Sequence, residues 1–158
     1  MKIKHTTPLK EGDMAPDIEA KDQKGKNISL KDFRGKKVIL YFYPKDDTPG
    51  CTAESCDLRD NYKRLQKKGY EVIGVSADNE KSHQKFIKKF DLPFPLIADI
   101  DKKVISDYGV WGPKNFMGLE FDGIIRTTFV INENGIVERI FDKVKTKDHT
   151  EQILETYK

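Results

Sequence analysis

Six consecutive apolar or aromatic residues fill positions 38–43, reading Val38-Ile39-Leu40-Tyr41-Phe42-Tyr43. An unbroken apolar run of this length predicts a β-strand that is covered on both faces of its sheet. Pro44 follows directly and ends the strand, since proline has no N–H to donate to a neighbouring strand. In sheets with parallel strands, functional sites lie beyond the carboxyl ends of the strands. The segment after Tyr43 is therefore the first place where we expect chemistry.

The patterns on both sides of this strand predict an α/β protein with a mixed central sheet flanked by helices. Spacing and caps predict helices at about 49–68, after Asp78-Asn79, at 102–108 and at 147–157. Further strands are expected at 71–76, 93–98, 124–131 and 136–141, the last two joined through the turn Glu133-Asn134-Gly135. Residues 16–30 predict a β-hairpin ahead of the sheet. Residues 111–122 are expected to form a loop whose apolar side chains pack on their own domain or, as the alternative, offer an apolar wall to a bulky substrate.

Composition narrows the class of protein. The 158 residues suit one domain, which we expect to span residues 1–158. The net charge of +3 arises from interleaved acidic and basic residues and does not indicate nucleic-acid binding. No run approaches the ~20 apolar residues of a membrane helix, and no apolar core of a secretory signal follows the basic N-terminal residues. Because two cysteines cannot form a disulfide scaffold, we expect a cytoplasmic protein with reactive or metal-binding cysteines.

The two cysteines, Cys51 and Cys56, lie on the helix predicted after the strand. If Thr48 is the N-cap and Pro49 the first helical residue, Cys51 lies in the first turn. The unpaired backbone N–H groups and the positive end of the helix dipole at that position favour a thiolate. Cys56 lies more than a turn further along the helix, so the two thiols should differ in role.

The spacing of the two cysteines limits how they can bond. Five residues along an ideal helix place two Cα atoms roughly 8.6 Å apart, whereas a disulfide needs a Cα separation within about 7 Å. Cys51 and Cys56 can therefore bridge only if the first turns of the helix unwind, which makes the pair a candidate redox switch. The residues alone leave a second interpretation open, in which both cysteines are small buried apolar side chains.

The remaining metal-binding residue types do not form a site in the sequence. Two cysteines five positions apart lack the second pair of a zinc site, and His5, His83 and His149 are scattered and expected at the surface. The segment Asp99–Asp101 lacks the glycine and the glutamate of a calcium loop. We expect neither a metal nor a cofactor.

The pattern Pro44-x-x-x-Thr48-x-x-Cys51 matches the active-site signature of peroxiredoxins, and the cysteine at position 56 resembles the peroxiredoxin Q, or bacterioferritin comigratory protein, subfamily. The resemblance covers the chain from about Gly12 to its C-terminus. It implies a thioredoxin-like fold with an N-terminal β-hairpin extension. It also implies a monomeric, thiol-dependent peroxidase in antioxidant defence and redox homeostasis, without haem, flavin or metal. The other matching stretches are Tyr41–Thr52, Tyr108–Gly112, Phe116–Gly118 and Gly123–Phe129.

The resemblance also implies roles for individual residues. Cys51 matches the peroxidatic nucleophile and Cys56 the resolving cysteine, joined in an intramolecular disulfide that thioredoxin or a similar dithiol protein reduces. Thr48 matches the hydroxyl that hydrogen-bonds the thiolate and the peroxide. Pro44 matches the proline that shields the thiolate from water. Arg126 matches the active-site arginine that reaches in from a later strand, whereas the residue taken alone would be expected on the surface.

Some alternatives stay open at this point. Glu54, one turn beyond Cys51, either orients the start of the helix or stabilises its dipole as an ordinary carboxylate. A thioredoxin-like disulfide reductase is the alternative enzyme, although such enzymes use Cys-x-x-Cys and four residues separate the cysteines here. A redox sensor that uses helix unwinding as its signal is the non-enzymatic alternative. The preferred peroxide is also open, either hydrogen peroxide or an organic hydroperoxide.

Overall fold

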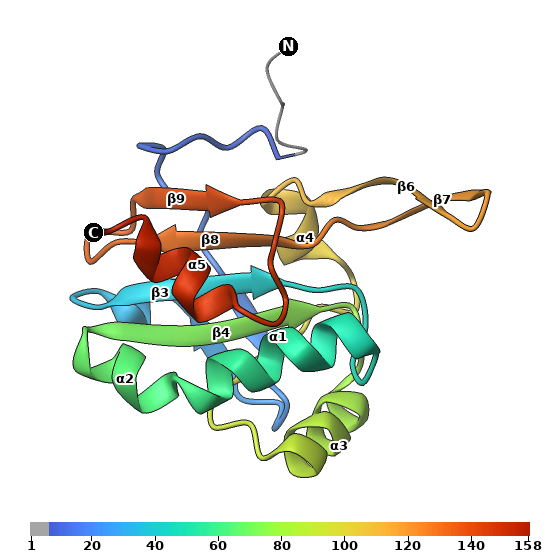
Figure 1. The fold of residues 1–158 in the computed structure, drawn as a ribbon, viewed down its shortest axis with the longest axis horizontal. Coiled ribbons are helices and arrows are strands. Elements are labelled where there is room, and N and C mark those ends of the chain that lie inside the picture. The colour runs from blue at the N-terminus through green and yellow to red at the C-terminus, as the bar shows by residue number, and fades with distance from the viewer. Residues whose placement is uncertain (1–6) are drawn as a thin grey trace.

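A computed structural model describes residues 7–158, with residue 116 described by its backbone alone. Its centre is a five-stranded sheet in the order β5-β4-β3-β8-β9 (Figure 1). Strands β3, β4 and β5 run parallel, whereas β8 pairs antiparallel with both β3 and β9, so the sheet is mixed as predicted. The strands are β3 Lys37–Phe42, β4 Tyr70–Ser76, β5 Leu96–Ala98, β8 Thr127–Ile131 and β9 Val137–Phe141.

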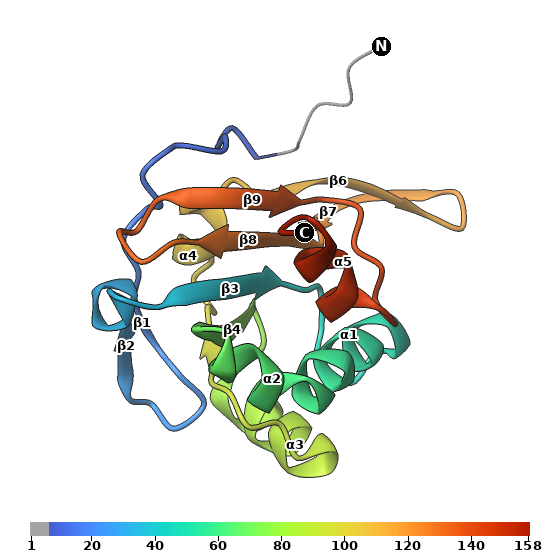
Figure 2. The same cartoon turned by 60° about the vertical axis from the view of Figure 1, so that its left-hand side comes forward.

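Alternate side chains of β3 enter two different cores, one on each face of the sheet. Ile39 and Tyr41 pack with side chains from four helices, which gather on one face (Figure 2). Leu40 and Phe42 pack on the other face with side chains of α4 (Lys103–Asp107). Burial on both faces explains the unbroken apolar sequence of β3. The four helices are α1 Pro49–Asp60, α2 Tyr62–Lys67, α3 Glu80–Phe90 and α5 His149–Glu155.

Two hairpins lie outside the central sheet. β1 (Glu19–Lys21) and β2 (Asn27–Ser29) form the predicted N-terminal hairpin, which a 3-10 turn over Leu30–Phe33 follows. β6 (Trp111–Phe116) and β7 (Leu119–Ile124) form a second hairpin that projects away from the sheet (Figure 1). The expectation of a packed loop over 111–122 is wrong, because the side chains of Met117 and Leu119 are 86% and 70% exposed.

The structure also divides two predicted elements. The helix expected at 49–68 is interrupted at Asn61, whose side-chain amide donates to the carbonyl oxygen of Asp57 and competes with the helical backbone. The strand expected at 124–131 is divided because the N–H of Ile125 bonds to Val110, outside the central sheet. Arg126 therefore lies between β7 and β8, at the edge of both.

Among residues 7–158, no helix is both long enough and apolar enough to cross a bilayer.

Candidate active site

The segment between β3 and α1 places a helix N-terminus beside the carboxyl end of the central parallel strand. Thr48 is the N-cap, with extended φ and ψ of −102° and 155°, and Pro49 opens the helix as predicted. The Thr48 side chain makes no capping bond, and the first turn contains no acidic residue. The free backbone N–H groups and the positive end of the helix dipole are thus left to act on the side chain that lies there, which is Cys51.

Cys51 is fully buried, and its sulfur accepts a hydrogen bond from Nη2 of Arg126 at 3.2 Å. The two residues meet because β8, which Arg126 precedes, pairs with β3, which leads to Cys51. Gly50 leaves space for this contact, since a Cβ there would lie 3.1 Å from Nη2 of Arg126. The surface position that the residue type alone suggests for Arg126 is wrong, because its side chain is only 21% exposed.

Glu54 holds the other side of the Arg126 guanidinium. Its Oε1 accepts a hydrogen bond from Nη1 of Arg126 at 2.7 Å, and its side chain is fully buried. Although burial disfavours the charge of Arg126, Glu54 and Cys51 raise the pKa of the guanidinium above its ordinary value. Burial raises the pKa of Glu54 from 4.5 to about 7, while Arg126 opposes this change. Glu54 therefore contacts the arginine rather than acting as a solvated carboxylate at the helix start.

The expected surface position of the histidines is wrong for the two that the structure describes. His83 and His149 are fully buried rather than at the surface, and His5 lies outside the described residues. Nε2 of His149 lies 2.9 Å from Oγ1 of Thr128 and 3.5 Å from Oε2 of Glu54, so α5 contributes to the surroundings of the site. Burial lowers the pKa of His149 from 6.5 to about 4, with Arg126 adding to the effect and Gln152 opposing it. Sequence reasoning missed this residue because the polar sequence around it resembles an exposed helix start.

A second buried histidine anchors the segment between β3 and α1. Nδ1 of His83 lies 2.7 Å from Oδ2 of Asp46, and Nε2 lies 2.9 Å from the carbonyl oxygen of Ile97. Asp46 also accepts hydrogen bonds from the hydroxyls of Tyr43 and Ser82. Asp46, Asp78 and His83 have ligand atoms close enough together to hold a metal ion. Because hydrogen bonds within the protein already occupy the oxygens of Asp46, we interpret the cluster as structural.

The surroundings of the Cys51 sulfur are completed by Thr48, Pro44 and Lys114. The Thr48 hydroxyl donates to the carbonyl oxygen of Lys45 at 2.8 Å, and among the described residues it makes no bond to Cys51. Pro44 is partly buried directly after Tyr43.

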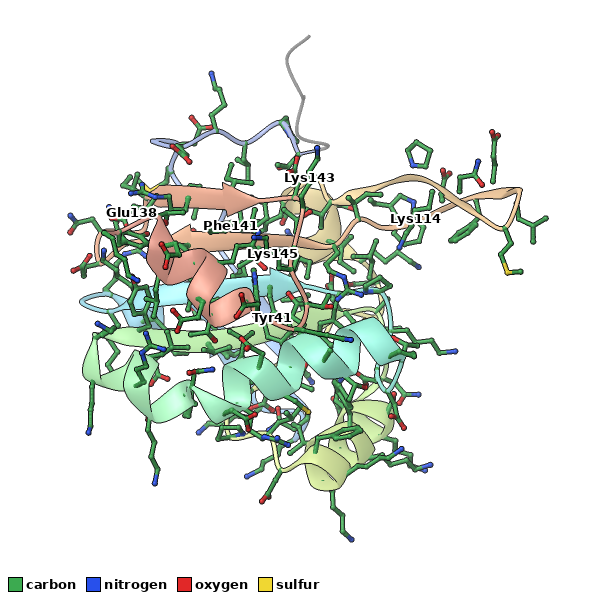
Figure 3. All side chains as sticks on the ribbon, viewed as in Figure 1. Tyr41, Lys114, Glu138, Phe141, Lys143 and Lys145 are labelled. Carbon is green, nitrogen blue, oxygen red and sulfur yellow. The ribbon has the colours of Figure 1, made fainter. Side chains whose placement is uncertain are left out.

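Lys114, labelled on the hairpin in Figure 3, donates to the carbonyl oxygen of Ile124. Burial and the charge of Arg126 lower the pKa of Lys114, and the Cys51 sulfur opposes this, so a second cation lies near the site. Sequence reasoning missed it by treating 111–122 as a loop.

Cys56 lies on the same continuous helix as Cys51 and is partly buried. Both cysteines are free thiols in this structure. Burial raises the pKa of the Cys56 thiol, so the two sulfurs occupy different surroundings as predicted. A buried sulfur that accepts a hydrogen bond from a cation can act as a nucleophile, and the neighbouring N–H donors can hold a substrate that bears oxygen.

Comparisons with known proteins agree with this geometry. Residues 11–140 match the model of the AhpC/TSA family. The chain is 48% identical to a putative peroxiredoxin bcp of Haemophilus influenzae, over 94% of this chain and 96% of the relative. It is 46% identical to peroxiredoxin Bcp of Escherichia coli K12, over 93% of this chain and 94% of the relative. It superposes on Xanthomonas campestris peroxiredoxin Q with a TM-score of 0.84, at 33% identity and 96% coverage of both chains.

The thioredoxin-like fold, the buried cysteine at the start of a helix and the similarity over nearly the whole chain agree with one another. The reaction class is that of a thiol peroxidase, an oxidoreductase. The chain belongs to the AhpC/TSA family, within its Bcp or peroxiredoxin Q group.

Proposed function

We propose that Cys51 is the peroxidatic cysteine, which reduces hydrogen peroxide and organic hydroperoxides, and that Cys56 is the resolving cysteine. The resulting intramolecular disulfide is then reduced by thioredoxin or a similar dithiol protein. One observation carries the assignment of Cys51: its buried sulfur lies in the first turn of α1 and accepts a hydrogen bond from Arg126. The described chain would act as one domain and as a monomer, in antioxidant defence.

The first step transfers one oxygen atom to sulfur. The Cys51 thiolate attacks the terminal oxygen of the peroxide, an S–O bond forms and the O–O bond breaks. Sulfur is oxidised to a sulfenic acid, and the leaving oxygen takes a proton to become water or an alcohol. The free N–H groups of the first turn and the guanidinium of Arg126 face this sulfur, so they can hold the peroxide and stabilise charge on the leaving oxygen.

Magnitudes favour transition-state stabilisation over simple thiol ionisation. An ordinary thiol with a pKa of about 8.5 is ~3% ionised at pH 7, so complete ionisation gains at most about thirtyfold. Lowering a thiol pKa by about three units costs a similar factor, because nucleophilicity falls with a Brønsted slope of ~0.4–0.5. The two effects nearly cancel. Most of the acceleration must therefore come from donors that bind the stretched O–O bond more tightly than the substrate, as Arg126 is placed to do.

Pro44 and Thr48 line the segment that leads to the reactive sulfur. Pro44 lacks an N–H and is partly buried, which suits the role of keeping water from the thiolate. The Thr48 hydroxyl donates to Lys45 in this structure. For the proposed contact with the peroxide, Thr48 keeps oxygen lone pairs that can accept a hydrogen bond from the O–H of the substrate.

The second step requires the helix to open. Cys51 and Cys56 both lie within the continuous helix α1, where their separation is too long for a disulfide. The absence of a side-chain cap at Thr48 makes the first turn easier to unwind. The Cys56 thiol then attacks the sulfenic sulfur, an S–S bond forms, the S–O bond breaks and water leaves. A dithiol protein restores both thiols by two thiol–disulfide exchange steps.

Two serine variants test this assignment. Cys51→Ser should lose peroxide reduction by at least a thousandfold, because a hydroxyl is a far weaker nucleophile than a thiolate. Cys56→Ser should still consume about one peroxide per chain, with a sulfenic acid on Cys51 that mass spectrometry detects, but should not turn over with thioredoxin. Multiple turnovers of Cys56→Ser with thioredoxin alone would reject Cys56 as the resolving cysteine. Near-normal activity of Cys51→Ser would reject the whole assignment.

A further inference from the structure

One buried polar atom beside the active site has no role in the reaction proposed above. Oε1 of Glu54 accepts from Arg126, but Oε2 has no hydrogen-bond partner among the described residues. In α5, Nε2 of His149 lies 3.5 Å from Oε2, and both side chains are fully buried. An unpartnered carboxylate oxygen in such a place is costly unless something else stabilises it.

The amide of Gln152 determines which nitrogen of His149 carries the proton. Its Nε2 donates to the carbonyl oxygen of Lys143, and its Oε1 accepts from the backbone N–H of Lys145. These two bonds fix the orientation of the amide, in the segment between β9 and α5 where Figure 3 labels Lys143 and Lys145. The same Oε1 lies 2.9 Å from Nδ1 of His149. Because a carbonyl oxygen only accepts, Nδ1 must be the donor.

The other ring nitrogen then faces Glu54 as an acceptor. A neutral imidazole that is protonated at Nδ1 carries a lone pair at Nε2. The hydroxyl of Thr128, 2.9 Å from Nε2, can supply one hydrogen. It makes no hydrogen bond to Oε2 of Glu54, which has no partner among the described residues, so two acceptors face each other across 3.5 Å. A proton on one of them removes this repulsion.

We propose that Glu54 and His149 hold one proton between them, carried on Glu54, and that His149 is thereby a positioning residue for the peroxidase. A protonated Glu54 donates from Oε2 toward Nε2 of His149 and still accepts the Arg126 hydrogen bond at Oε1. Arg126 is then held in place by a neutral group, and its positive charge is left to the Cys51 sulfur and the peroxide. This inference rests on the proposed function, because it needs Arg126 to assist Cys51.

The surroundings of the pair agree with this assignment. From α1, Asp57 raises the pKa of Glu54 in the same direction as burial, and Arg126, just before β8, lowers it. The pKa of Glu54 reaches about 7. On the other side of His149, the ring of Phe141 lies edge-on at 6.0 Å and brings no charge. Burial and Arg126 both disfavour a cationic imidazole, so the proton belongs on Glu54.

Glu54→Gln provides a sharp kinetic test, because the amide imitates the protonated carboxyl. Its oxygen can accept from Arg126, and its NH₂ group can donate to Nε2 of His149. Wild-type Glu54 should ionise as the pH rises through about 7, and its negative charge should then offset the positive charge of Arg126. We therefore expect the ratio of the peroxide rate constants, Glu54→Gln over wild type, to rise about tenfold between pH 6 and pH 8 in stopped-flow measurements. A ratio that is constant or falls would overturn the proposal.

A spectroscopic test does not depend on catalysis. Nitrogen-15 NMR of the histidine rings should show His149 protonated at Nδ1 and unprotonated at Nε2 near pH 6.5. A proton on Nε2 would place the shared proton on His149 and overturn the assignment, even if Cys51 and Cys56 behave as proposed. Thr150→Val is a matched control, because Thr150 is buried next to His149 and its hydroxyl has no hydrogen-bond partner among the described residues. It should change neither the pH ratio nor the NMR pattern.

Discussion

Gly50 shows how a missing side chain shapes the active site. Its neighbour Cys51 receives a hydrogen bond from Arg126, and a methyl group at position 50 would come within 3.1 Å of the same guanidinium. Such a distance is tighter than a normal van der Waals contact, so a larger residue would push Arg126 away from the sulfur. The arginine is also anchored by Glu54, and Glu54 in turn meets His149. Cys51 and Glu54 therefore hold this guanidinium directly, and His149 contacts it only through Glu54.

The buried residues Glu54 and His149 should change the stability of the protein in opposite directions as the pH rises. The raised pKa of Glu54 contributes stability that is present below pH 4.5 and is lost as the pH rises to about 7. The lowered pKa of His149 contributes stability that is present above pH 6.5 and is lost as the pH falls to about 4. Between pH 4.5 and 6.5 the two contributions oppose each other.

Replacing His149 should remove one of these opposing contributions. His149→Phe keeps a ring in the position next to Phe141 but cannot titrate. The free energy of unfolding of the variant should lie below that of the wild type at pH 7, because hydrogen bonds are lost. As the pH falls from 6.5 to 4, this deficit should shrink by on the order of 2–3 kcal/mol. Urea unfolding at several pH values measures the difference, and a deficit that grows toward low pH would contradict the expectation.

Helix α1 combines a stable anchor with a first turn that can open. The N-H of Thr52 bonds to the carbonyl oxygen of Thr48, but the Thr48 side chain adds no cap. Further along, Ser55 shares a hydrogen bond with the buried hydroxyl of Tyr41, and Asp57 accepts from the backbone N–H of Thr150 in α5. By contrast, α3 begins with the side chain of Asn79 accepting from Ser82. The start of α1 is thus the less firmly closed of these two helix starts.

Ala53→Gly should separate the two steps of the reaction. Ala53 lies between the cysteines and is only partly buried, and glycine in a helix interior costs about 1 kcal/mol relative to alanine. Unwinding of the turn should become about fivefold more favourable. Disulfide formation after one equivalent of peroxide should accelerate by a similar factor in quenched-flow experiments, while the initial reaction with peroxide changes little. If disulfide formation does not accelerate, unwinding of this turn does not limit it.

The whole molecule divides into a dense two-sided core and an exposed hairpin. The ring of Phe129 is fully buried. Its centroid lies 5.2 Å from the ring centroid of Tyr108 and 5.8 Å from that of Phe42. The tip of the β6–β7 hairpin, in contrast, exposes Met117 and Leu119. Figures 1 and 2 both show this hairpin extending beyond the sheet. Similar residue types therefore contribute very differently to stability.

Two substitutions measure this contrast. Phe129→Ala should lower the free energy of unfolding by roughly 3–5 kcal/mol, because it leaves a cavity between two aromatic rings. Leu119→Ser should change it by less than about 0.5 kcal/mol, because its side chain is 70% exposed. Guanidinium chloride unfolding of both variants provides the comparison. A large loss for Leu119→Ser would mean that the hairpin tip packs against the protein after all.

Short-range patterns in the sequence were enough to predict most of the fold. The apolar run of β3, the β1–β2 hairpin, Pro49 at the start of α1 and the alternation of strands and helices are local features, and each is confirmed. They could be predicted because hydrophobic periodicity and capping depend on neighbours within a few positions. The hairpin at 111–124 was missed because exposed apolar residues in it resemble a buried loop.

The surroundings of the reactive sulfur depend instead on packing between distant segments. Arg126 lies 75 positions from Cys51 and 72 from Glu54, and it reaches both only because β8 pairs with β3. His149 reaches Glu54 only because α5 packs against α1. Burial of this kind raises the pKa of Glu54 and lowers that of His149. The desolvation behind both changes exists only once the sheet and its helices have assembled, so no local pattern of residues can report it.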